Sequence, residues 1–155
     1  MKRLFFIVFI LLVLSCFNSS NACSIFVTEF TVYIKSTIVG EDVTLRCQSK
    51  DDDFGYHVLN SSKVDYDWSF CQNFWGSTLY FCHFWRPNYE QVFDVFNNTI
   101  VKHCIQGTFD DNICSYEVRD DGFYLFKQDN YVWVKWFDWK QASSTELPKE
   151  YTLSP

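Results

Sequence analysis

The sequence predicts an all-β domain, an antiparallel β-sandwich stabilised by disulfide bonds. Short segments in which apolar and polar residues alternate are separated by turn residues about every ten positions, as in sandwiches. Aromatic residues, which favour strands, make up 21% of the chain. The chain has seven cysteines, and an even number remains after removal of an N-terminal leader that contains Cys16. We expect at most one short helix, near Asp110 or in the C-terminal tail.

The leader has the composition of a secretory signal peptide. Lys2 and Arg3 form its basic start, residues 4–14 are an unbroken apolar run, and Ser20 and Ala22 place small residues at the positions that direct cleavage. The run is shorter than the roughly 20 residues that a membrane-spanning helix needs. We therefore expect cleavage after Ala22, secretion to the extracellular space, and a mature chain that is not embedded in a membrane.

Length and charge narrow the classes of function. The chain has 155 residues, enough for one ordinary domain, which we place at residues 23–142, followed by a loose tail at 143–155. The formal net charge is -6, and loss of the two cations of the leader takes the mature chain from -6 to -8. Binding to phosphates needs clustered Lys and Arg, so nucleic acids and anionic membrane surfaces are unsuitable partners. We expect a monomer without a cofactor.

The strands are read from the alternation of apolar and polar residues. They are expected at residues 30–35, 43–48, 64–70, 78–85, 91–96, 113–118, 123–127 and 131–139. The run at 78–85 is almost wholly apolar, so we expect a central strand that is covered on both faces. Asp120-Asp121-Gly122 indicates a tight hairpin, and residues 101–112 form a loop anchored by Cys104.

Several polar clusters could carry chemistry, and for each a structural role is the favoured interpretation. Asp51-Asp52-Asp53 could bind calcium through carboxylate oxygens, but the EF-hand spacing is absent, and capping of backbone N–H groups is more typical of such a loop. His57, His83 and His103 lack metal-ligand spacing. His103 precedes Cys104, but an oxidised cysteine is no nucleophile. We therefore expect no metal site and no catalytic residue.

Aromatic side chains offer a second kind of site, a platform on which a glycan could stack. A glycan-binding module requires tryptophans that face the solvent, whereas most tryptophans in so aromatic a domain belong to the core. The candidates are Trp75, Trp85, Trp133, Trp136 and Trp139. Asn60 and Asn97 each open an N-glycosylation sequon beside a predicted turn, so we expect glycans on both.

Several blocks of the sequence, in order, resemble the plant self-incompatibility S1 family, the secreted S-protein homologues. Residues 47–55 read Cys-Gln-Ser-Lys-Asp-Asp-Asp-Phe-Gly and are similar to the family's Cys-Lys-Ser-Lys-Asp-Asp-Asp-Leu-Gly. Residues 73–82 read Asn-Phe-Trp-Gly-Ser-Thr-Leu-Tyr-Phe-Cys and are similar to Asn-Phe-x-Gly-x-Thr-Leu-Phe-Phe-Cys. Phe-Asp-Val at 93–95 and the block 117–125 resemble later family segments, so the likeness covers Thr31 to Trp139.

The resemblance implies a secreted, non-enzymatic β-sandwich. Founding members of the family act in the pistil as ligands that trigger rejection of self pollen. A ligand of a plant cell-surface receptor is therefore the leading functional hypothesis, with a glycan-binding module as the alternative and a secreted hydrolase third. A self-incompatibility ribonuclease is disfavoured, because no pair of histidine motifs of that kind occurs. Tyr116 stands where the family commonly has Trp, and Cys71 is not a usual family cysteine.

The resemblance assigns the four common family cysteines to Cys47, Cys82, Cys104 and Cys114. Cys47 shares a strand face with apolar residues, and so does Cys114, so both side chains should point into the core. We predict the pairs Cys47–Cys114 and Cys82–Cys104, the second of which would anchor the loop at 101–112. Cys23 and Cys71 form a possible third pair.

For a binding protein the partner contacts are expected on loops. The charged loop from Lys50 to Tyr56 resembles the family signature, so we interpret it as part of the fold. Arg86–Glu90 and Gln106–Asn112 are polar and less family-like, and they are the first candidates for contact. An acidic ligand of this kind should meet a basic receptor surface, with an association rate that falls as salt rises.

Overall fold

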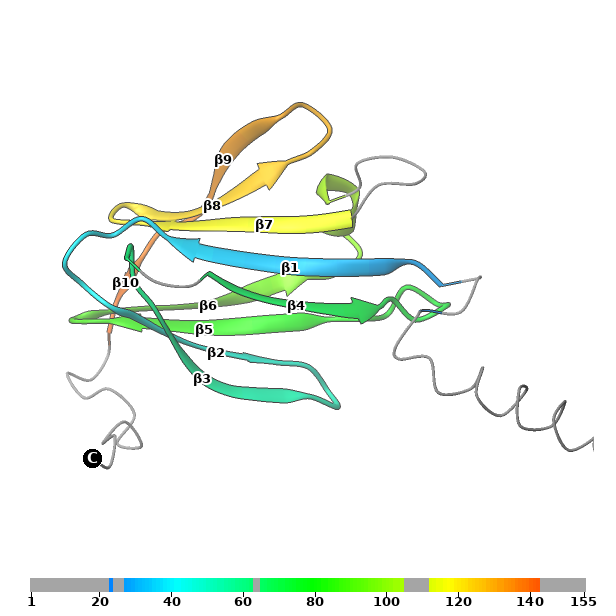
Figure 1. The fold of residues 1–155 in the computed structure, drawn as a ribbon, viewed down its shortest axis with the longest axis horizontal. Coiled ribbons are helices and arrows are strands. Elements are labelled where there is room, and N and C mark those ends of the chain that lie inside the picture. Colours follow the sequence, from blue (N-terminus) through cyan, green and yellow to red (C-terminus); the bar gives the residue numbers. More distant parts are fainter. Residues whose placement is uncertain (1–22, 24–26, 63–64, 105–111, 143–155) are drawn as a thin grey trace, which may run out of the picture.

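The computed structural model describes Cys23 and residues 27–62, 65–104 and 112–142. These residues form two five-stranded sheets that face each other (Figure 1). The first sheet contains, in spatial order, β4 (Tyr66–Cys71), β1 (Glu29–Ser36), β7 (Asn112–Arg119), β8 (Gly122–Lys127) and β9 (Val132–Phe137). The second sheet contains β10 (Lys140–Gln141), β6 (Tyr89–Phe96), β5 (Tyr80–Arg86), β2 (Val43–Gln48) and β3 (Asp53–Leu59). The predicted all-β sandwich is confirmed.

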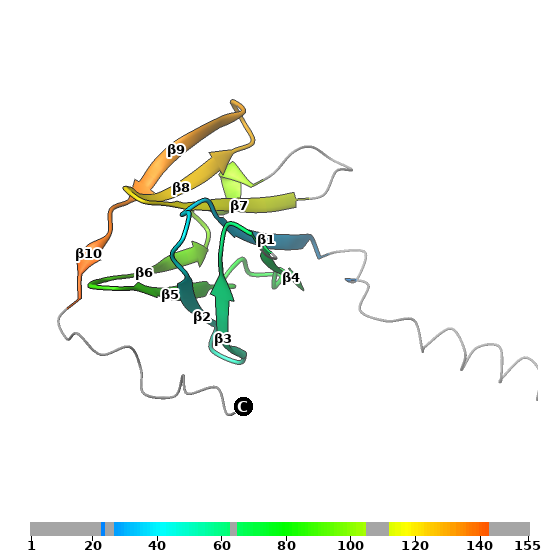
Figure 2. The same ribbon diagram turned by 60° about the vertical axis from the view of Figure 1, so that its left-hand side comes forward.

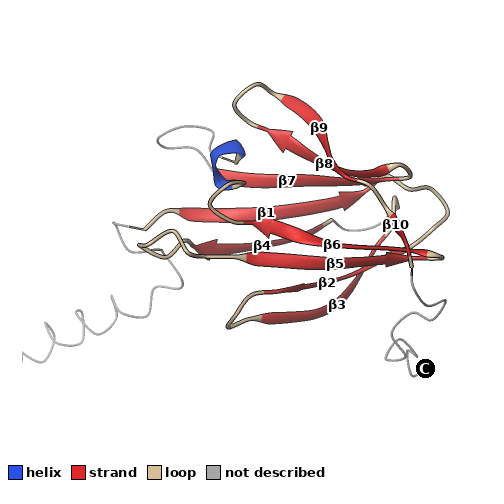
Figure 3. Ribbon diagram, turned by 180° about the vertical axis from the view of Figure 1, so that it is seen from behind, coloured by secondary structure: helices blue, strands red, loops and turns tan. Residues whose placement is uncertain are grey.

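The short helical segment of the described chain is the 3-10 turn η1 (Val101–His103), drawn in blue in Figure 3. It lies between β6 and β7 and thus within the segment that the sequence predicts as a loop. No helix among the described residues is long and apolar enough to cross a bilayer. The chain passes from β9 in the first sheet to β10 in the second along one side of the sandwich (Figure 2).

Strand pairing is antiparallel with one exception. β1 pairs with β4 in antiparallel register but with β7 in parallel register, from Phe30 opposite Asn112 to Ser36 opposite Val118. The sandwich is therefore mainly antiparallel, as predicted, with this one parallel pair among the described strands. Periodicity within a strand defines which residues share a face, but it carries no information about the direction of a neighbour that is distant in sequence.

The core lies between the sheets and follows the predicted alternation. In β1, Phe30, Val32 and Ile34 are buried, while Thr31 and Lys35 lie on the outer face. The same alternation recurs in the other central strands. The largest fully buried side chains include Tyr116, Phe84, Phe96, Phe123, Leu45 and Leu125.

β5 departs from the prediction. It is central in its sheet, but only Tyr80, Cys82 and Phe84 are buried, whereas His83 and Trp85 on the outer face are half-buried. A sandwich covers one face of each sheet, so an unbroken apolar run does not guarantee burial on both faces. The outer aromatic side chains of β5 instead cover each other, with the His83 and Trp85 rings stacked at 3.7 Å.

The two predicted core disulfides are wrong in their pairing. The structure joins Cys47 to Cys82 and Cys104 to Cys114. Cys47 and Cys114 do point into the core, but from opposite sheets, and facing sheets lie about 10 Å apart. Cys82 lies directly opposite Cys47 on the neighbouring strand, with 4.1 Å between the Cα atoms. The cross-strand neighbour is therefore the geometrically available partner.

The third disulfide joins Cys23 to Cys71, with Cα atoms 5.6 Å apart. The sequence suggests this pair only weakly, because a cysteine near a chain terminus can stay unpaired. Cys71 is the last residue of β4 and is exposed, and the residue after it, Gln72, donates its backbone N–H to the carbonyl of Thr28. The bridge therefore attaches the start of the predicted mature chain to the end of an edge strand.

Candidate functional site

Two loops at the same end of the sandwich enclose a depression of about 370 Å³. One is the β2–β3 loop, residues 49–52, and the other is the β4–β5 loop, residues 72–79. Both loops lie toward the right-hand end of the sandwich in Figure 1. The lining consists mainly of hydroxyl, amide and charged side chains from both loops, with Cys71 and Tyr80 at the adjoining strand ends. This depression and the loops around it are the candidate functional site.

The β2–β3 loop is held by hydrogen bonds to the Ser49 side chain. Its hydroxyl oxygen accepts the backbone N–H groups of Asp51 at 3.2 Å and Asp52 at 2.9 Å. Across the depression the Tyr80 hydroxyl donates to the Asp52 carboxylate at 3.0 Å. Burial, together with this hydrogen bond, raises the pKa of Tyr80 to about 12. Tyr80 therefore stays protonated as a donor, and the charged loop has a defined conformation.

The three consecutive aspartates have different surroundings. Asp52 binds Tyr80, whereas Asp53 forms an ion pair with Arg46 and accepts the backbone N–H of Gly55 at 3.0 Å. The hydrogen bond from Arg46 lowers the pKa of Asp53 to about 2. Gly55 has a φ of 70°, which favours glycine at this point. Among the described residues there is no group of three or more His, Cys, Asp or Glu side chains placed to hold a metal ion.

The β4–β5 loop is braced by both polar ends of the Asn73 side chain. Its amide donates to the Ser77 hydroxyl at 2.6 Å, and its carbonyl accepts the Ser77 backbone N–H at 2.7 Å. The backbone N–H of Asn73 donates to the Thr78 hydroxyl at 2.8 Å.

Gly76 takes a φ of 67°, a left-handed conformation that a residue with a Cβ rarely adopts. The loop is therefore a preformed turn.

This turn exposes two aromatic rings. Phe74 is 74% exposed and Trp75 is 84% exposed. Their rings contact each other edge to face, with centroids 5.4 Å apart. Of the five candidate tryptophans, Trp85, Trp133, Trp136 and Trp139 are only partly exposed. In the sequence, Asn73 to Gly76 interrupt the alternating strand pattern and so indicate a turn. Nothing in the sequence distinguishes the exposed Trp75 from the tryptophans of the strands.

The three histidines lie apart, and each interacts with a different group. His57 contacts the Phe54 carbonyl through Nε2 at 2.9 Å, and His83 Nε2 lies 3.1 Å from the Glu90 carboxylate. His103 Nδ1 lies 3.8 Å from the Asp129 carboxylate. Burial lowers the pKa of His83 and of His103. Each histidine thus interacts locally with its neighbours.

The β5–β6 turn, predicted within Arg86–Glu90 as a contact loop, contains a structural residue. The Arg86 side chain is 11% exposed and lies between Glu41 of the β1–β2 loop and Asp120 of the β7–β8 turn, at 3.5 Å and 3.4 Å. Its guanidinium also lies over the Trp139 ring at 4.8 Å. Arg86 therefore joins several loops at the opposite end of the sandwich, and it is unavailable to a partner.

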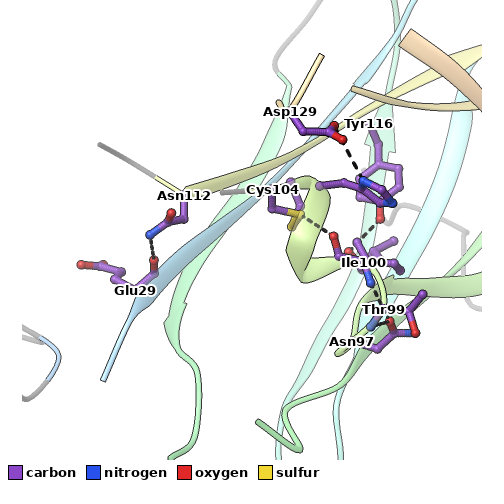
Figure 4. The surroundings of a disulfide bond; sticks show 11 residues. Glu29, Asn97, Thr99, Ile100, Cys104, Asn112, Tyr116 and Asp129 are labelled. Atoms are coloured by element: carbon purple, nitrogen blue, oxygen red, sulfur yellow. Dashed lines mark hydrogen bonds and ion pairs between the residues drawn. A yellow bond between two sulfur atoms is a disulfide. The ribbon is translucent and has the colours of Figure 1, made fainter. Parts of the chain in front are cut away.

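The second predicted contact loop, Gln106–Asn112, lies outside the described residues except for Asn112. Asn112 Nδ2 donates to the Glu29 carbonyl at 3.2 Å (Figure 4), and a disulfide joins Cys104 to Cys114. The buried Tyr116 hydroxyl donates to the Val95 carbonyl at 2.9 Å. Tyr116, where the family commonly has Trp, thus uses a hydroxyl that tryptophan lacks.

The two sequon asparagines differ in their contacts. Asn97 accepts the backbone N–H groups of Thr99 and Ile100 (Figure 4). It also donates to the Asp94 carboxylate at 2.9 Å. Asn60 accepts one backbone N–H, from Ser62 at 3.2 Å. Asn97 therefore holds its turn more firmly.

Replacing each sequon asparagine by glutamine should consequently have unequal effects on stability. Asn97→Gln is expected to lower the free energy of unfolding by about 1–2 kcal/mol, because the longer side chain cannot satisfy the same N–H groups. Asn60→Gln should cost less than about 0.5 kcal/mol. Urea unfolding of protein produced without glycans measures both. Equal losses would show that the Asn97 contacts do not hold the turn.

Comparison with known proteins identifies related chains. Residues 31–139 match the family described as Plant self-incompatibility protein S1. Among curated relatives from Arabidopsis thaliana, S-protein homolog 6 is 32% identical over 96 residues, which cover 59% of this chain and 65% of the relative. S-protein homolog 5 is 36% identical over 91 residues, with 59% and 66% coverage. S-protein homolog 31 is 32% identical over 124 residues, with 68% and 84% coverage. The first two matches span slightly less than two thirds of each relative's length.

Proposed function

Because the chain belongs to the plant self-incompatibility protein S1 family, we propose that it is a secreted ligand that acts by binding a cell-surface receptor protein, without catalysis. The signal peptide would be removed after Ala22, and the mature domain would act outside the cell. Asn60 and Asn97 would carry glycans on its surface. The participation of Cys23 in a disulfide supports a mature chain that retains this residue.

One observation carries the proposal: the sandwich presents a turn with exposed aromatic rings on a rigid frame. Three disulfides and two facing sheets fix the frame, and the β4–β5 loop holds Phe74 and Trp75 in solvent. Large apolar side chains held in solvent add little to folding and are typical of binding surfaces. Such a frame with displayed loops suits recognition.

A saturation-binding experiment tests the receptor hypothesis. Mature protein, labelled at its C-terminus, is added to protoplasts of the plant from which the sequence derives. We expect saturable binding that is lost when the protoplasts are first treated with trypsin. The same protein after reduction and alkylation serves as the unfolded control and should not bind. Robust hydrolysis of a polysaccharide or nucleic acid by the purified protein would overturn the non-enzymatic proposal.

A glycan-binding module is the second candidate, and the exposure of Trp75 is the observation that favours it. A tryptophan ring in solvent beside a polar depression could stack on a sugar. This alternative predicts binding to isolated cell walls, which protoplasts lack, that survives trypsin treatment and is competed by soluble cell-wall polysaccharide. The two hypotheses therefore predict binding to different preparations, protoplasts for a receptor ligand and cell walls for a glycan-binding module.

A further inference from the structure

We propose that the partner is bound at the end of the sandwich that displays Phe74 and Trp75, and that the partner is a protein with an apolar pocket bordered by basic side chains. This inference rests on the receptor-binding function proposed above. It moves the predicted interface away from Arg86–Glu90. It also assigns roles to the two loops: the β4–β5 loop supplies apolar contact and the β2–β3 loop supplies charge.

The aromatic pair is the strongest anchor that the described surface offers. Other highly exposed apolar side chains include Val39 at 85% and Tyr131 at 71%, whereas Phe74 and Trp75 are adjacent and in ring contact. Each such ring buries roughly 150–250 Å² when it enters a pocket. Tryptophan is also among the residues that contribute most to protein interfaces. A partner pocket that receives both rings would supply most of the binding free energy.

The turn that carries these rings is already ordered, so binding loses little conformational entropy. Asn73 bonds to Ser77 through both the amide and the oxygen of its side chain. The backbone N–H of Gly76 donates to the backbone carbonyl of Asn73 at 2.9 Å. Cys71, directly before the turn, is covalently tied to Cys23. Preorganisation of this kind increases affinity without adding contacts.

Charge at the neighbouring loop favours a basic partner. The lining of the depression contains the carboxylates of Asp51 and Asp52 against the single ammonium of Lys50. The nearby cation on β2, Arg46, is paired with Asp53. The local excess of negative charge agrees in sign with the acidic chain as a whole. A basic rim on the partner would therefore be attracted to this end.

The hydrogen bonding of the depression favours a protein over a sugar. Recognition of a saccharide depends on side chains that offer donors and acceptors to its hydroxyl groups. Here the polar side chains of Ser49, Asp52, Asn73, Ser77 and Thr78 each bond within or between the loops. They hold the turns in place. The groups that remain available to contact a partner are the exposed rings of Phe74 and Trp75 and the exposed charges at the rim of the depression.

Two sets of variants test the surface in the protoplast assay. Phe74→Ser/Trp75→Ser should weaken binding by about 30-fold or more, the loss typical of interface anchors. The matched control is Tyr131→Ser, which removes a similarly exposed ring at the β8–β9 turn and should change affinity by less than about twofold. Both should keep the wild-type thermal midpoint. Asp51→Asn should lower the association rate at low salt, whereas Lys50→Gln should leave it unchanged or raise it.

Each result decides between the hypotheses. If wild-type protein binds saturably to trypsin-sensitive sites and Phe74→Ser/Trp75→Ser binds equally well, this surface is refuted while the receptor function stands. If wild-type protein shows no saturable binding, both are refuted. Binding that survives trypsin and is competed by soluble polysaccharide refutes a protein partner. A slower association for Lys50→Gln together with a faster one for Asp51→Asn refutes the basic rim.

Discussion

Replacing Cys47 and Cys82 together by alanine is expected to lower the free energy of unfolding by about 4 kcal/mol. The bridge closes a loop with a sequence separation of 35 residues, and in the chain-entropy model the lost constraint on the unfolded chain grows with loop size. Both side chains are fully buried, so replacement by alanine also leaves a small cavity in the core. Small domains have unfolding free energies of roughly 5–15 kcal/mol. The variant should therefore lose between about a quarter and four fifths of its stability.

The measurement is guanidinium unfolding followed by circular dichroism under oxidising conditions. The matched control is Cys104→Ala/Cys114→Ala, whose sequence separation is 10 residues and whose loss should be smaller, about 3 kcal/mol. Peptide mapping without reduction should recover a linked Cys47–Cys82 peptide from wild-type protein. A linked Cys47–Cys114 peptide would restore the pairing first predicted from the sequence. A loss below about 1 kcal/mol would show that the bridge adds little to the paired strands.

Replacing Arg86 by alanine should lower the free energy of unfolding by about 3 kcal/mol, the second large effect. The guanidinium donates to the Asp120 carbonyl at 2.9 Å and lies over the rings of Tyr89 and Trp139, each at 4.8 Å. Removing it deprives the Glu41 carboxylate of its ion-pair partner. The Arg86 side chain is 11% exposed and Glu41 is 36% exposed, so most of the loss comes from the charge-assisted hydrogen bond and the two ring contacts of the buried guanidinium.

Arg46→Ala is the control for this prediction. Arg46 also pairs with a carboxylate, that of Asp53, and lies over the Tyr56 ring at 5.1 Å, but its side chain is 34% exposed. Solvent screening limits such a pair, so the loss should be below about 1 kcal/mol. The loss in unfolding free energy for Arg86→Lys should lie between those for Arg86→Ala and Arg46→Ala, because lysine keeps the charge but lacks the planar group that stacks and forms two hydrogen bonds. Equal losses for Arg86→Ala and Arg46→Ala would contradict the conclusion that Arg86 holds several loops together.

The fold class could be predicted from the sequence because the residues on each face of a strand recur at every second position. In β1, Phe30, Val32 and Ile34 alternate with polar residues, and the structure buries these three. The Asp120-Asp121 turn is likewise local, and β7 and β8 meet there with Arg119 opposite Gly122. Information of this kind lies within a few residues. Elements that depend on it were therefore predictable.

The remaining features depend on residues that meet only after folding. Cys47 and Cys82 become neighbours because β2 pairs with β5, and the face that each cysteine occupies does not specify that pairing. Arg86 is a junction because loops from both sheets converge on it. Trp75 is exposed because Asn73 and Ser77 close a turn beneath it. In each case the sequence shows the residue type but not its neighbours.

The parallel pairing of β1 with β7 has a consequence for the order in which the chain folds. β1 lies near the start of the described domain, yet Phe30 pairs with Asn112, so the first sheet cannot be completed until the chain has been made as far as β7. The strands β2, β3, β5 and β6 lie within residues 43–96 and contain both cysteines of the Cys47–Cys82 bridge. Contacts of short sequence separation form faster than distant ones. We therefore expect this half of the sandwich to fold and oxidise first, and to serve as the template on which β1 and β7 later meet.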